Sequence, residues 1–520
     1  MRQLDLAVKG QSRQSSDMST DTLATDTSAT DTPAAADLSR VRTNPSTLAR
    51  TRERIGLMTE AARRAGSYAA NAGSRPVAPA PADVAALSVL RRPLPDRGAP
   101  ARAVLAELDR VGSPAATVTN NGRYFGFVTG GTDPAAQAAA ILAGAWDQNP
   151  GGASAIGAEL DRVACTWVID ALGLPAGSAA SFNAGATVAN LTGIIAARDA
   201  LYARLGWSVA ERGLAGAPAL RVVVGEEIHA SALKALRLAG FGEAQLERVP
   251  TDATGAVKAD AFPTDTDERT LVLLQAGNVN TGASDPFAAV IPGVRERGGW
   301  VHVDGAFGLW AAASPTLRHL VASVELADSW ATDAHKWLQV PYDSGLVIVR
   351  DPDALTRAMT SQAAYLSPDP TAPMNRGIQI SQRARGVETW AMLATHGRAG
   401  LADIIDRSCA QARRFASGLA SAGAQILAPV TLNQVLVAFG DGEQTAATIA
   451  AVQADGTCWA GATTWKGRCA MRISVSDAAT TNDDVDASIA AIVACWESVR
   501  AGASSPAASP HSSPHGSIRL

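Results

Sequence analysis

Short apolar runs alternate with helix-length segments along the centre of the sequence, and this alternation is the strongest constraint on the fold. The runs are rich in Val, Leu and Ile and cover residues 221–224, 270–274, 300–303 and 346–349. An Ala- and Leu-rich stretch at 230–238 predicts one of the intervening helices. Strands separated by helices form a mainly parallel sheet that is buried on both faces. The sequence therefore predicts an α/β fold with a large, mainly parallel sheet.

Composition separates an ordered centre from two tails. Both ends are rich in Ser, Thr, Asp, Ala or Pro and hold too few large apolar side chains to offset the entropy of ordering. A strand-like run at 470–475, flanked by helical segments, predicts a smaller α+β domain near the C-terminus. The predicted parts are a disordered tail at 1–46, a helical segment with a Pro-rich break at 47–150, the large α/β domain at 151–385, the small domain at 386–500 and a second disordered tail at 501–520.

Charge and hydropathy exclude several classes of protein. Lys and Arg number 45 against 49 Asp and Glu, a net charge of −4, which does not favour nucleic-acid binding. Hydrophobic residues make up 47% of the chain, enough for a large core and a subunit interface. No apolar stretch reaches the roughly 18–20 residues of a membrane span, and the start lacks the apolar core of a secretory signal. Five scattered cysteines without a CxxC pair favour the cytoplasm.

The most informative segment lies at 328–337 and contains Lys336. This lysine stands among apolar neighbours, including Trp330 and Trp337. Apolar surroundings disfavour the charged ammonium, so we expect a lowered pKa and a nucleophilic amine. Asp333 and His335 could hold a phosphate or orient that amine. The alternative is a surface lysine beside an aromatic ring.

A carboxylate at the end of a strand is the second candidate. The strand predicted at 300–303 is followed by Asp304, and alternation places His302 on the same face. A carboxylate at this position can pair with a positively charged ring nitrogen. A solvated turn and a His-x-Asp metal pair are the alternatives. The sequence offers no spaced third ligand, so no metal site is predicted.

Two loops add groups that can bind a cofactor. Small residues at 182–190 lead into a helix predicted at 191–203, where free backbone N–H groups and the Thr187 hydroxyl form an anion cradle. A plain helix cap is the alternative reading, and no nucleotide motif is present. His229 opens the helix at 230–238, where its ring can lie flat on a planar cofactor or simply cap the helix. Together the four segments supply what pyridoxal 5′-phosphate requires: an amine, a carboxylate, a stacking ring and a phosphate cradle.

The sequence resembles the group II pyridoxal-phosphate-dependent decarboxylases, which include the aromatic amino acid and glutamate decarboxylases. The resemblance runs from about residue 124 to residue 476. Its most specific motif is Asp-Ala-His-Lys-Trp at 333–337, followed by His-Val-Asp-Gly-Ala-Phe at 302–307 and Ala-Gly-Asn-Val-Asn-Thr-Gly at 276–282. The resemblance implies the fold type I architecture, an amino acid substrate and a homodimer with active sites at the subunit interface.

The family's functional residues transfer position by position. The resemblance makes Lys336 the Schiff-base lysine, Asp304 the partner of the pyridine nitrogen and His229 the stacking histidine. It implies phosphate contacts from Ala186 and Thr187 with His335 beside them, and polar cofactor contacts from Asn278 and Asn280. Arg472 matches an arginine that contacts the substrate carboxylate in the glutamate-specific branch. Three aromatics, Phe125, Phe127 and Trp310, are expected either to build part of the substrate pocket or to belong to the core.

Two departures leave the reaction open. The family often carries an acidic residue where Val188 stands, and it carries a tyrosine on a mobile loop after the lysine that protonates the substrate carbon. None of the five tyrosines falls between residues 366 and 385. Either Tyr365 substitutes for it, another acid does, or the reaction is diverted. Decarboxylation to an amine and CO₂ is therefore the main prediction. An aminotransferase, lyase or aldehyde synthase reaction is the first alternative, and a cofactor-binding protein without activity is the second.

Overall fold

The computed structural model describes residues 45–152, 154–361 and 363–503. The chain forms two compact units, Met1–Ala62 and Arg63–Leu520, and the second contains both β-sheets. Most of the two predicted tails lies outside the described residues. Helix α1 (Pro45–Ala72) begins just inside the first predicted tail, and helix α13 (Asn482–Ala503) ends just inside the second, so both tail boundaries are corrected by a few residues.

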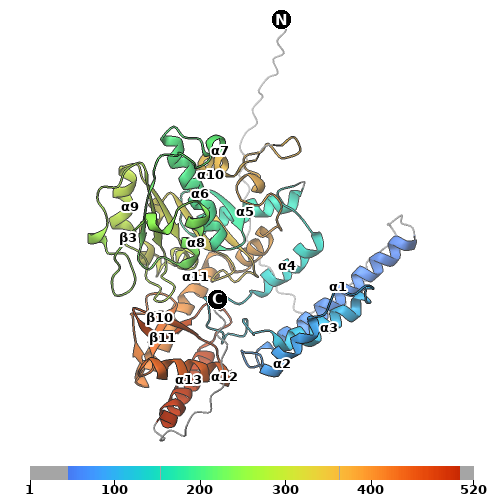
Figure 1. Ribbon diagram of the computed structural model, residues 1–520. Helices are drawn as coiled ribbons and strands as arrows, with labels where there is room; N and C mark the ends of the chain where they lie inside the picture. The colour runs from blue at the N-terminus through green and yellow to red at the C-terminus, as the bar shows by residue number, and fades with distance from the viewer. Residues whose placement is uncertain (1–44, 153, 362, 504–520) are drawn as a thin grey trace, which may run out of the picture. The chain divides into compact units, whose positions relative to one another are not determined.

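The stretch that precedes the large sheet is helical, as the sequence predicts. It contains α1, α2 (Pro81–Ala86), α3 (Ala101–Ala115) and α4 (Pro134–Trp146), with the Pro-rich break between α1 and α2 (Figure 1). Asp133 caps α4 by accepting hydrogen bonds from the Ala135 and Ala136 amides. No helix among the described residues is long and apolar enough to cross a bilayer.

Seven strands form the large sheet in the order β1-β7-β6-β5-β4-β2-β3. Strands β6, β5, β4, β2 and β3 run parallel to one another, and β7 is antiparallel to both β6 and β1. The bounds are β1 (Ala179–Asn183), β2 (Arg221–Gly225), β3 (Leu246–Val249), β4 (Thr270–Gln275), β5 (Trp300–Asp304), β6 (Ser329–Asp333) and β7 (Gly345–Val349). All four predicted runs are strands of this sheet, which confirms the mainly parallel α/β fold.

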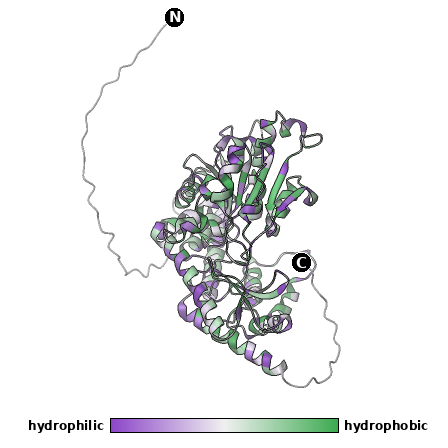
Figure 2. Cartoon of the chain, turned by 90° about the vertical axis from the view of Figure 1, so that its left-hand side faces the viewer, coloured by the Kyte–Doolittle hydropathy of each residue, from purple (hydrophilic) through white to green (hydrophobic). Residues whose placement is uncertain are grey.

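Helices cover both faces of this sheet. Helices α6 (Ala186–Arg204), α8 (Ala230–Leu238) and α10 (Pro352–Met359) share one apolar cluster with the strands. Helices α5 (Ala155–Ala171), α9 (Phe287–Glu296) and α11 (Gly386–Ser421) share the other. Figure 2 shows the strands coloured mainly as hydrophobic, as burial on both faces requires. The α6 helix begins five residues earlier than the predicted start at 191.

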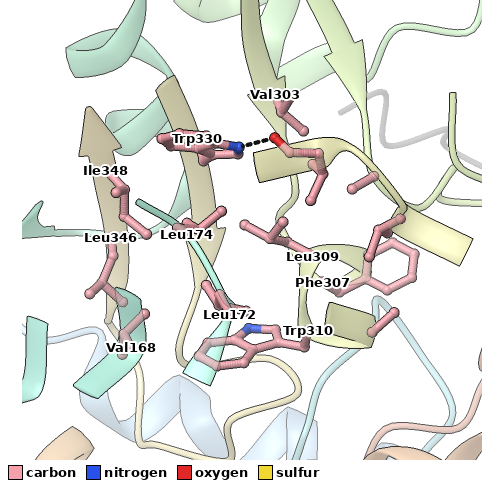
Figure 3. Close-up of a cluster of buried hydrophobic side chains, with 14 of the residues drawn as sticks. Val168, Leu172, Leu174, Val303, Phe307, Leu309, Trp310, Trp330, Leu346 and Ile348 are labelled. Atoms are coloured by element: carbon pink, nitrogen blue, oxygen red, sulfur yellow. Dashed lines mark hydrogen bonds between the residues drawn. The ribbon is translucent and has the colours of Figure 1, made fainter. Parts of the chain in front are cut away.

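Buried aromatic side chains stabilise the layer beneath β5, β6 and β7 (Figure 3). The Trp330 indole Nε1 donates to the Val324 carbonyl at 2.9 Å, and Trp310 Nε1 donates to the Asp333 carbonyl at 3.1 Å. Both side chains are fully buried in this cluster. Trp310 therefore belongs to the core, which was one of its two expected roles, and it does not line a substrate pocket.

A four-stranded antiparallel sheet, in the order β10-β11-β9-β8, forms the smaller C-terminal part. Its strands are β8 (Gln425–Ile426), β9 (Gln434–Ala438), β10 (Gly461–Trp465) and β11 (Arg468–Ser474). Helices α12 (Gly442–Asp455) and α13 belong to the same part of the chain, which is therefore α+β. Phe125 is only 1% exposed and packs edge-on against Phe415 in the core of this part, with ring centroids 4.9 Å apart. The assignment of Phe125 to the substrate pocket is thus wrong.

The turn that carries Lys336 is fixed from two sides. A Cβ atom added to Gly130 would lie 1.7 Å from the Lys336 carbonyl oxygen, so the backbone of residue 130 packs directly on this turn. On the other side, the buried Gln339 side chain donates to the Ser476 carbonyl at 2.5 Å and accepts from the Ala478 amide at 2.9 Å. The position of Lys336 therefore depends on the N-terminal segment and on the C-terminal part together.

We predict that Gly130→Ala lowers the free energy of unfolding by at least about 2 kcal/mol, because a methyl group has no space against the turn. Gly144→Ala is the matched control. It lies within α4, a Cβ there meets nothing within 4 Å, and alanine raises helix stability by about 0.5–1 kcal/mol. Urea denaturation of both variants measures the difference. A Gly130→Ala protein as stable as the wild type contradicts the close approach.

Candidate active site

A cavity of about 330 Å³ opens at the carboxyl ends of the parallel strands. Lys336 follows β6, Asp304 ends β5 and His229 follows β2, so three of the predicted residues line it together. A fourth predicted residue, Arg472, reaches the cavity from β11 of the C-terminal part. Loops that follow parallel strands meet at one edge of the sheet, which explains why residues far apart in the sequence converge here.

The Lys336 amine is held by a buried ion pair. Its Nζ lies 2.9 Å from Asp333 Oδ2, and the Asp333 side chain is only 3% exposed. Burial alone lowers the pKa of Lys336, but attraction to Asp333, the hydrogen bond to it and attraction to Asp304 together raise that pKa above its usual value. The expectation of a lowered pKa is therefore wrong. It considered the effect of the apolar neighbours on the pKa but treated Asp333 only as a group that could orient the amine or hold a phosphate, without the effect of its charge.

A directional chain of hydrogen bonds ends on Asp304. The Asn190 amide Nδ2 donates to Asp304 Oδ2 at 2.9 Å, while Asn190 Oδ1 lies 2.9 Å from His302 Nε2. The amide oxygen can only accept, so His302 carries its proton on Nε2. Sequence reasoning missed Asn190, because a polar residue within a helix carries no signal of its own in the sequence.

The same chain continues from His302 to Ser329. His302 Nδ1 lies 2.8 Å from Ser329 Oγ, which accepts the Trp300 indole N–H at 2.9 Å. Burial lowers the pKa of His302 to about 3, so its ring is neutral. With both ring nitrogens engaged in this chain, His302 forms no metal pair with Asp304. The described residues contain no cluster of three or more His, Cys, Asp or Glu that could hold a metal ion.

His229 both caps a helix and faces the cavity. Its Nδ1 accepts the Ser231 amide hydrogen at 3.2 Å at the start of α8, and its backbone amide donates to Gln275 Oε1 at 3.1 Å. Burial lowers the pKa of His229, despite the carboxylate of Asp304 nearby. A neutral ring that is held through Nδ1, on a residue whose backbone amide is also bonded, is suited to packing flat on a planar cofactor.

The start of α6 differs from the expected phosphate cradle in one respect. The Ala186 amide, expected to hold phosphate, donates to Asp333 Oδ1 at 2.5 Å. Gly185 has a φ of +91°, and a Cβ there would lie 2.9 Å from the His335 ring, so only glycine fits. His335 accepts the Ser344 amide hydrogen on Nδ1 at 3.1 Å, and the structure places it beside this helix start as expected. Thr187 lies one residue into the helix.

The loop after β4 corrects two predicted contacts. Asn278 Oδ1 accepts the Asn280 amide hydrogen at 2.9 Å, and Asn280 Oδ1 accepts the Thr463 hydroxyl hydrogen at 3.0 Å. Neither asparagine lines the cavity, whereas Gly277 and Val279 do. Both side chains are used to shape the loop and to bind β10, so neither is placed to contact a cofactor in the cavity.

Two aromatic residues near the cavity complete the site. Phe127 lines the cavity and is 63% exposed. A place in the pocket was one of the two roles expected for this residue. Tyr342 was not predicted: its ring centroid lies 4.3 Å from that of His335, and its hydroxyl is 3.4 Å from Thr129 Oγ1. Its position six residues after the lysine was the available signal.

Arg472 lies deep in the site without an acidic partner among the described residues. Its Nη1 is 3.4 Å from the Val279 carbonyl, and burial lowers its pKa. A buried guanidinium beside Lys336 and His229 gives this end of the cavity a positive field. Such a field suits a carboxylate of the substrate.

Comparison with known proteins identifies the family. The model for the "Pyridoxal-dependent decarboxylase conserved domain" matches residues 86–440. The chain belongs to this family. It is 29% identical over 359 residues to tryptophan decarboxylase 1 of Oryza sativa subsp. japonica, covering 63% of this chain and 68% of that protein. It is 27% identical over 278 residues to a phenylacetaldehyde synthase of Arabidopsis thaliana, covering 49% and 55%.

The fold agrees with that of solved relatives. The crystal structure of Oryza sativa TDC with PLP and tryptamine superimposes with a TM-score of 0.75 at 24% identity, covering 91% of this chain and 99% of that one. The protein is thus a pyridoxal-phosphate-dependent carboxy-lyase of fold type I. The cavity fits the cofactor: it offers a buried amine, a buried carboxylate and a neutral ring, and a glycine-dependent helix start lies beside His335.

We predict that His302 contributes a pH-dependent part of this decarboxylase's stability. Its pKa is about 3 in the folded chain and about 6.5 when unfolded, so its contribution is complete above pH 6.5 and is lost as the pH falls below that value. Between pH 7 and pH 5 this loss amounts to about 2 kcal/mol. The free energy of unfolding in urea is measured for the wild type and for His302→Gln at both pH values. The two proteins share every other titrating group, so the difference in their pH dependence is the contribution of His302. Equal pH dependence in the two proteins contradicts a neutral buried histidine.

Proposed function

We propose that this family member converts an L-amino acid to its amine and CO₂, and that the Lys336 amine would hold the cofactor covalently at its aldehyde carbon, with release of water. The observation that carries the proposal is the Lys336 amine, buried in a cavity that also holds Asp304, His229 and Arg472. When bound, pyridoxal phosphate supplies an electron sink for the bond that breaks at the substrate Cα. Every other task falls to side chains of the chain itself.

Asp333 and Asp304 divide the proton handling at the cofactor. Asp333 Oδ2, 2.9 Å from Lys336 Nζ, accepts the proton that the ammonium must lose before it can act as a nucleophile. Asp304, fixed by Asn190, keeps the ring nitrogen of the cofactor protonated. The neutral His229 ring holds the plane of the cofactor without adding charge.

Phosphate binding involves the start of α6. The helix dipole and the Thr187 hydroxyl favour an anion there, with His335 beside them. Ala186 can join only if Asp333 Oδ1 gives up the amide hydrogen that it now accepts. We propose that Asp333 then keeps its contact with Lys336 without the Ala186 amide.

Tyr342 is our candidate for the acid that returns a proton to the substrate carbon. Its ring packs on His335, and its hydroxyl approaches Thr129. Tyr365, the alternative from the sequence, is 86% exposed, against 63% for Tyr342, and Tyr342 has the contact with His335 beside the lysine. Arg472 would bind a carboxylate of the substrate, and Phe127 and Val279 would contact its side chain.

We also propose that the protein is a homodimer whose active sites lie at the subunit interface. We propose further that it resides in the cytoplasm. Helix α4 is almost entirely apolar, yet Ala136 is its one buried residue, and Ile141, Leu142 and Trp146 are more than 40% exposed. An apolar helix surface of this kind is typical of a subunit interface. The partner subunit would also cover the exposed Phe127 at the cavity. All five cysteines are free, which supports a reducing compartment.

An aldehyde synthase reaction is the second candidate. Aldehyde synthases are among the relatives, and residues 366–385 contain no tyrosine. In that reaction the amino acid, dioxygen and water yield the aldehyde, CO₂, ammonia and hydrogen peroxide. Dioxygen is the oxidant, and peroxide formation distinguishes the two reactions.

We predict that borohydride reduction of the purified holoenzyme fixes a pyridoxyl group on the peptide that contains Lys336, as peptide mapping by mass spectrometry will reveal. Lys336→Ala should lose the label, the visible absorbance of the bound cofactor and all turnover. Lys258→Ala, an exposed lysine, should keep all three. A label on any other lysine refutes the assignment of Lys336.

We predict that Tyr342→Phe slows amine formation at least tenfold and raises the share of aldehyde, because the substrate carbon then lacks its acid. Amine, aldehyde, CO₂ and peroxide from a panel of amino acids, aromatic ones first, measure the change. Tyr365→Phe is the matched control and should behave as the wild type. If Tyr342→Phe retains wild-type rates and products, Tyr342 is not the acid. If the wild type itself forms aldehyde and peroxide, the second candidate replaces the first.

A further inference from the structure

A second cavity lies at the outer edge of the large sheet. It has a volume of about 390 Å³ and lies between α5, the edge strand β1 and the segment at 367–376. It shares no lining residue with the cavity that contains Lys336. The two cavities are therefore separate sites.

Three buried polar atoms at this cavity have no hydrogen-bond partner among the described residues. They are Arg376 Nε, Ser178 Oγ and Ser181 Oγ. The Ser181 side chain is nine-tenths buried, with the residue only 3% exposed. A Cβ atom added to Gly377 would lie 3.1 Å from Ser181 Oγ, so the residue that follows Arg376 packs directly on this hydroxyl. The unpartnered donors thus lie on two segments that touch each other.

Arg376 has no close ion-pair partner among the described residues, although it is partly buried and the lining also contains Glu159, Asp161 and Asp369. Asp369, the nearby carboxylate, accepts its hydrogen bonds from the Thr371 amide and hydroxyl instead, both at 2.8 Å. These hydrogen bonds and the charge of Arg376 lower the pKa of Asp369. The other arginine in the lining, Arg162, is paired with Glu159. Water could satisfy the serine hydroxyls, but it cannot neutralise a guanidinium.

We propose that this cavity binds a small oxyanion, a carboxylate or a phosphate, through Arg376, Ser178 and Ser181. A guanidinium presents a planar fork of N–H donors that matches two oxygens of either group, and the hydroxyls add two further donors. Asp161, which accepts the Gly386 amide hydrogen at 2.7 Å, bounds the other side of the cavity. Bound oxyanion would tie the 367–376 segment to β1 and α5.

Calorimetric titration of the holoenzyme tests the site, because the bound cofactor already occupies the catalytic phosphate position. Inorganic phosphate and acetate are titrated separately, with sodium chloride at equal ionic strength as the reference. We expect one saturable site per chain for at least one of the two anions, and the anion that binds identifies the ligand class. Arg376→Gln should weaken binding at least tenfold. Arg162→Gln, an arginine in the same lining that is already paired, should leave binding unchanged.

A second measurement covers the case in which Arg376→Gln fails to fold. Ser181→Ala should weaken binding several-fold, and in the wild type the bound anion should slow hydrogen exchange at 367–376 and in β1. The absence of saturable binding overturns the proposal. So does binding that is unchanged in Ser181→Ala or Arg376→Gln, or protection that appears elsewhere. Because no catalytic assay is involved, failure here is distinguishable from failure of the proposed decarboxylation.

Discussion

The carboxylate of Asp333 is the contact on which the site depends. One of its oxygens accepts the first amide hydrogen of α6, and the other lies 2.9 Å from the amine of Lys336. A single buried anion thereby sets the distance between the helix start and the lysine. It also keeps the amine protonated in spite of burial, since a buried ammonium is stable only beside a compensating charge. The carboxyl ends of the strands bring the site residues to one edge of the sheet. The Asp333 carboxylate then fixes the start of α6 relative to Lys336.

Much of the fold could be predicted from the sequence, because the spacing of apolar residues and the composition of a segment depend only on neighbours in the chain. The four apolar runs are strands, and the predicted helix at Ala230–Leu238 has those bounds in the structure. Three strands of the large sheet, β1, β3 and β6, were not predicted. In β3 two of the four residues are charged, and β6 carries Ser, Thr and Asp among its five, so neither forms an aliphatic run.

The site was predictable where a motif carries the chemistry and unpredictable where distant contacts decide. Lys336, Asp304, His229 and Arg472 converge on one cavity as expected. Phe125 and Phe127 are two residues apart, yet the first lies in the core of the C-terminal part and the second lines the cavity. Asn278 and Asn280 have the right chemistry for a cofactor contact but are used within their own loop and against β10. Such outcomes depend on neighbours that are remote in sequence.

The hydrogen-bond chain from Trp300 through Ser329, His302 and Asn190 to Asp304 has a fixed polarity. An indole can only donate and a carboxylate can only accept, so each middle member must do both, in one order. An aspartate in place of Asn190 would have no hydrogen to pass on, and an apolar residue would interrupt the sequence. If Asp304 pairs with the ring nitrogen of the cofactor, as proposed, repacking this part of the core would change the electron affinity of that ring, and interior residues that never meet the substrate would help to set how strongly the cofactor withdraws electrons.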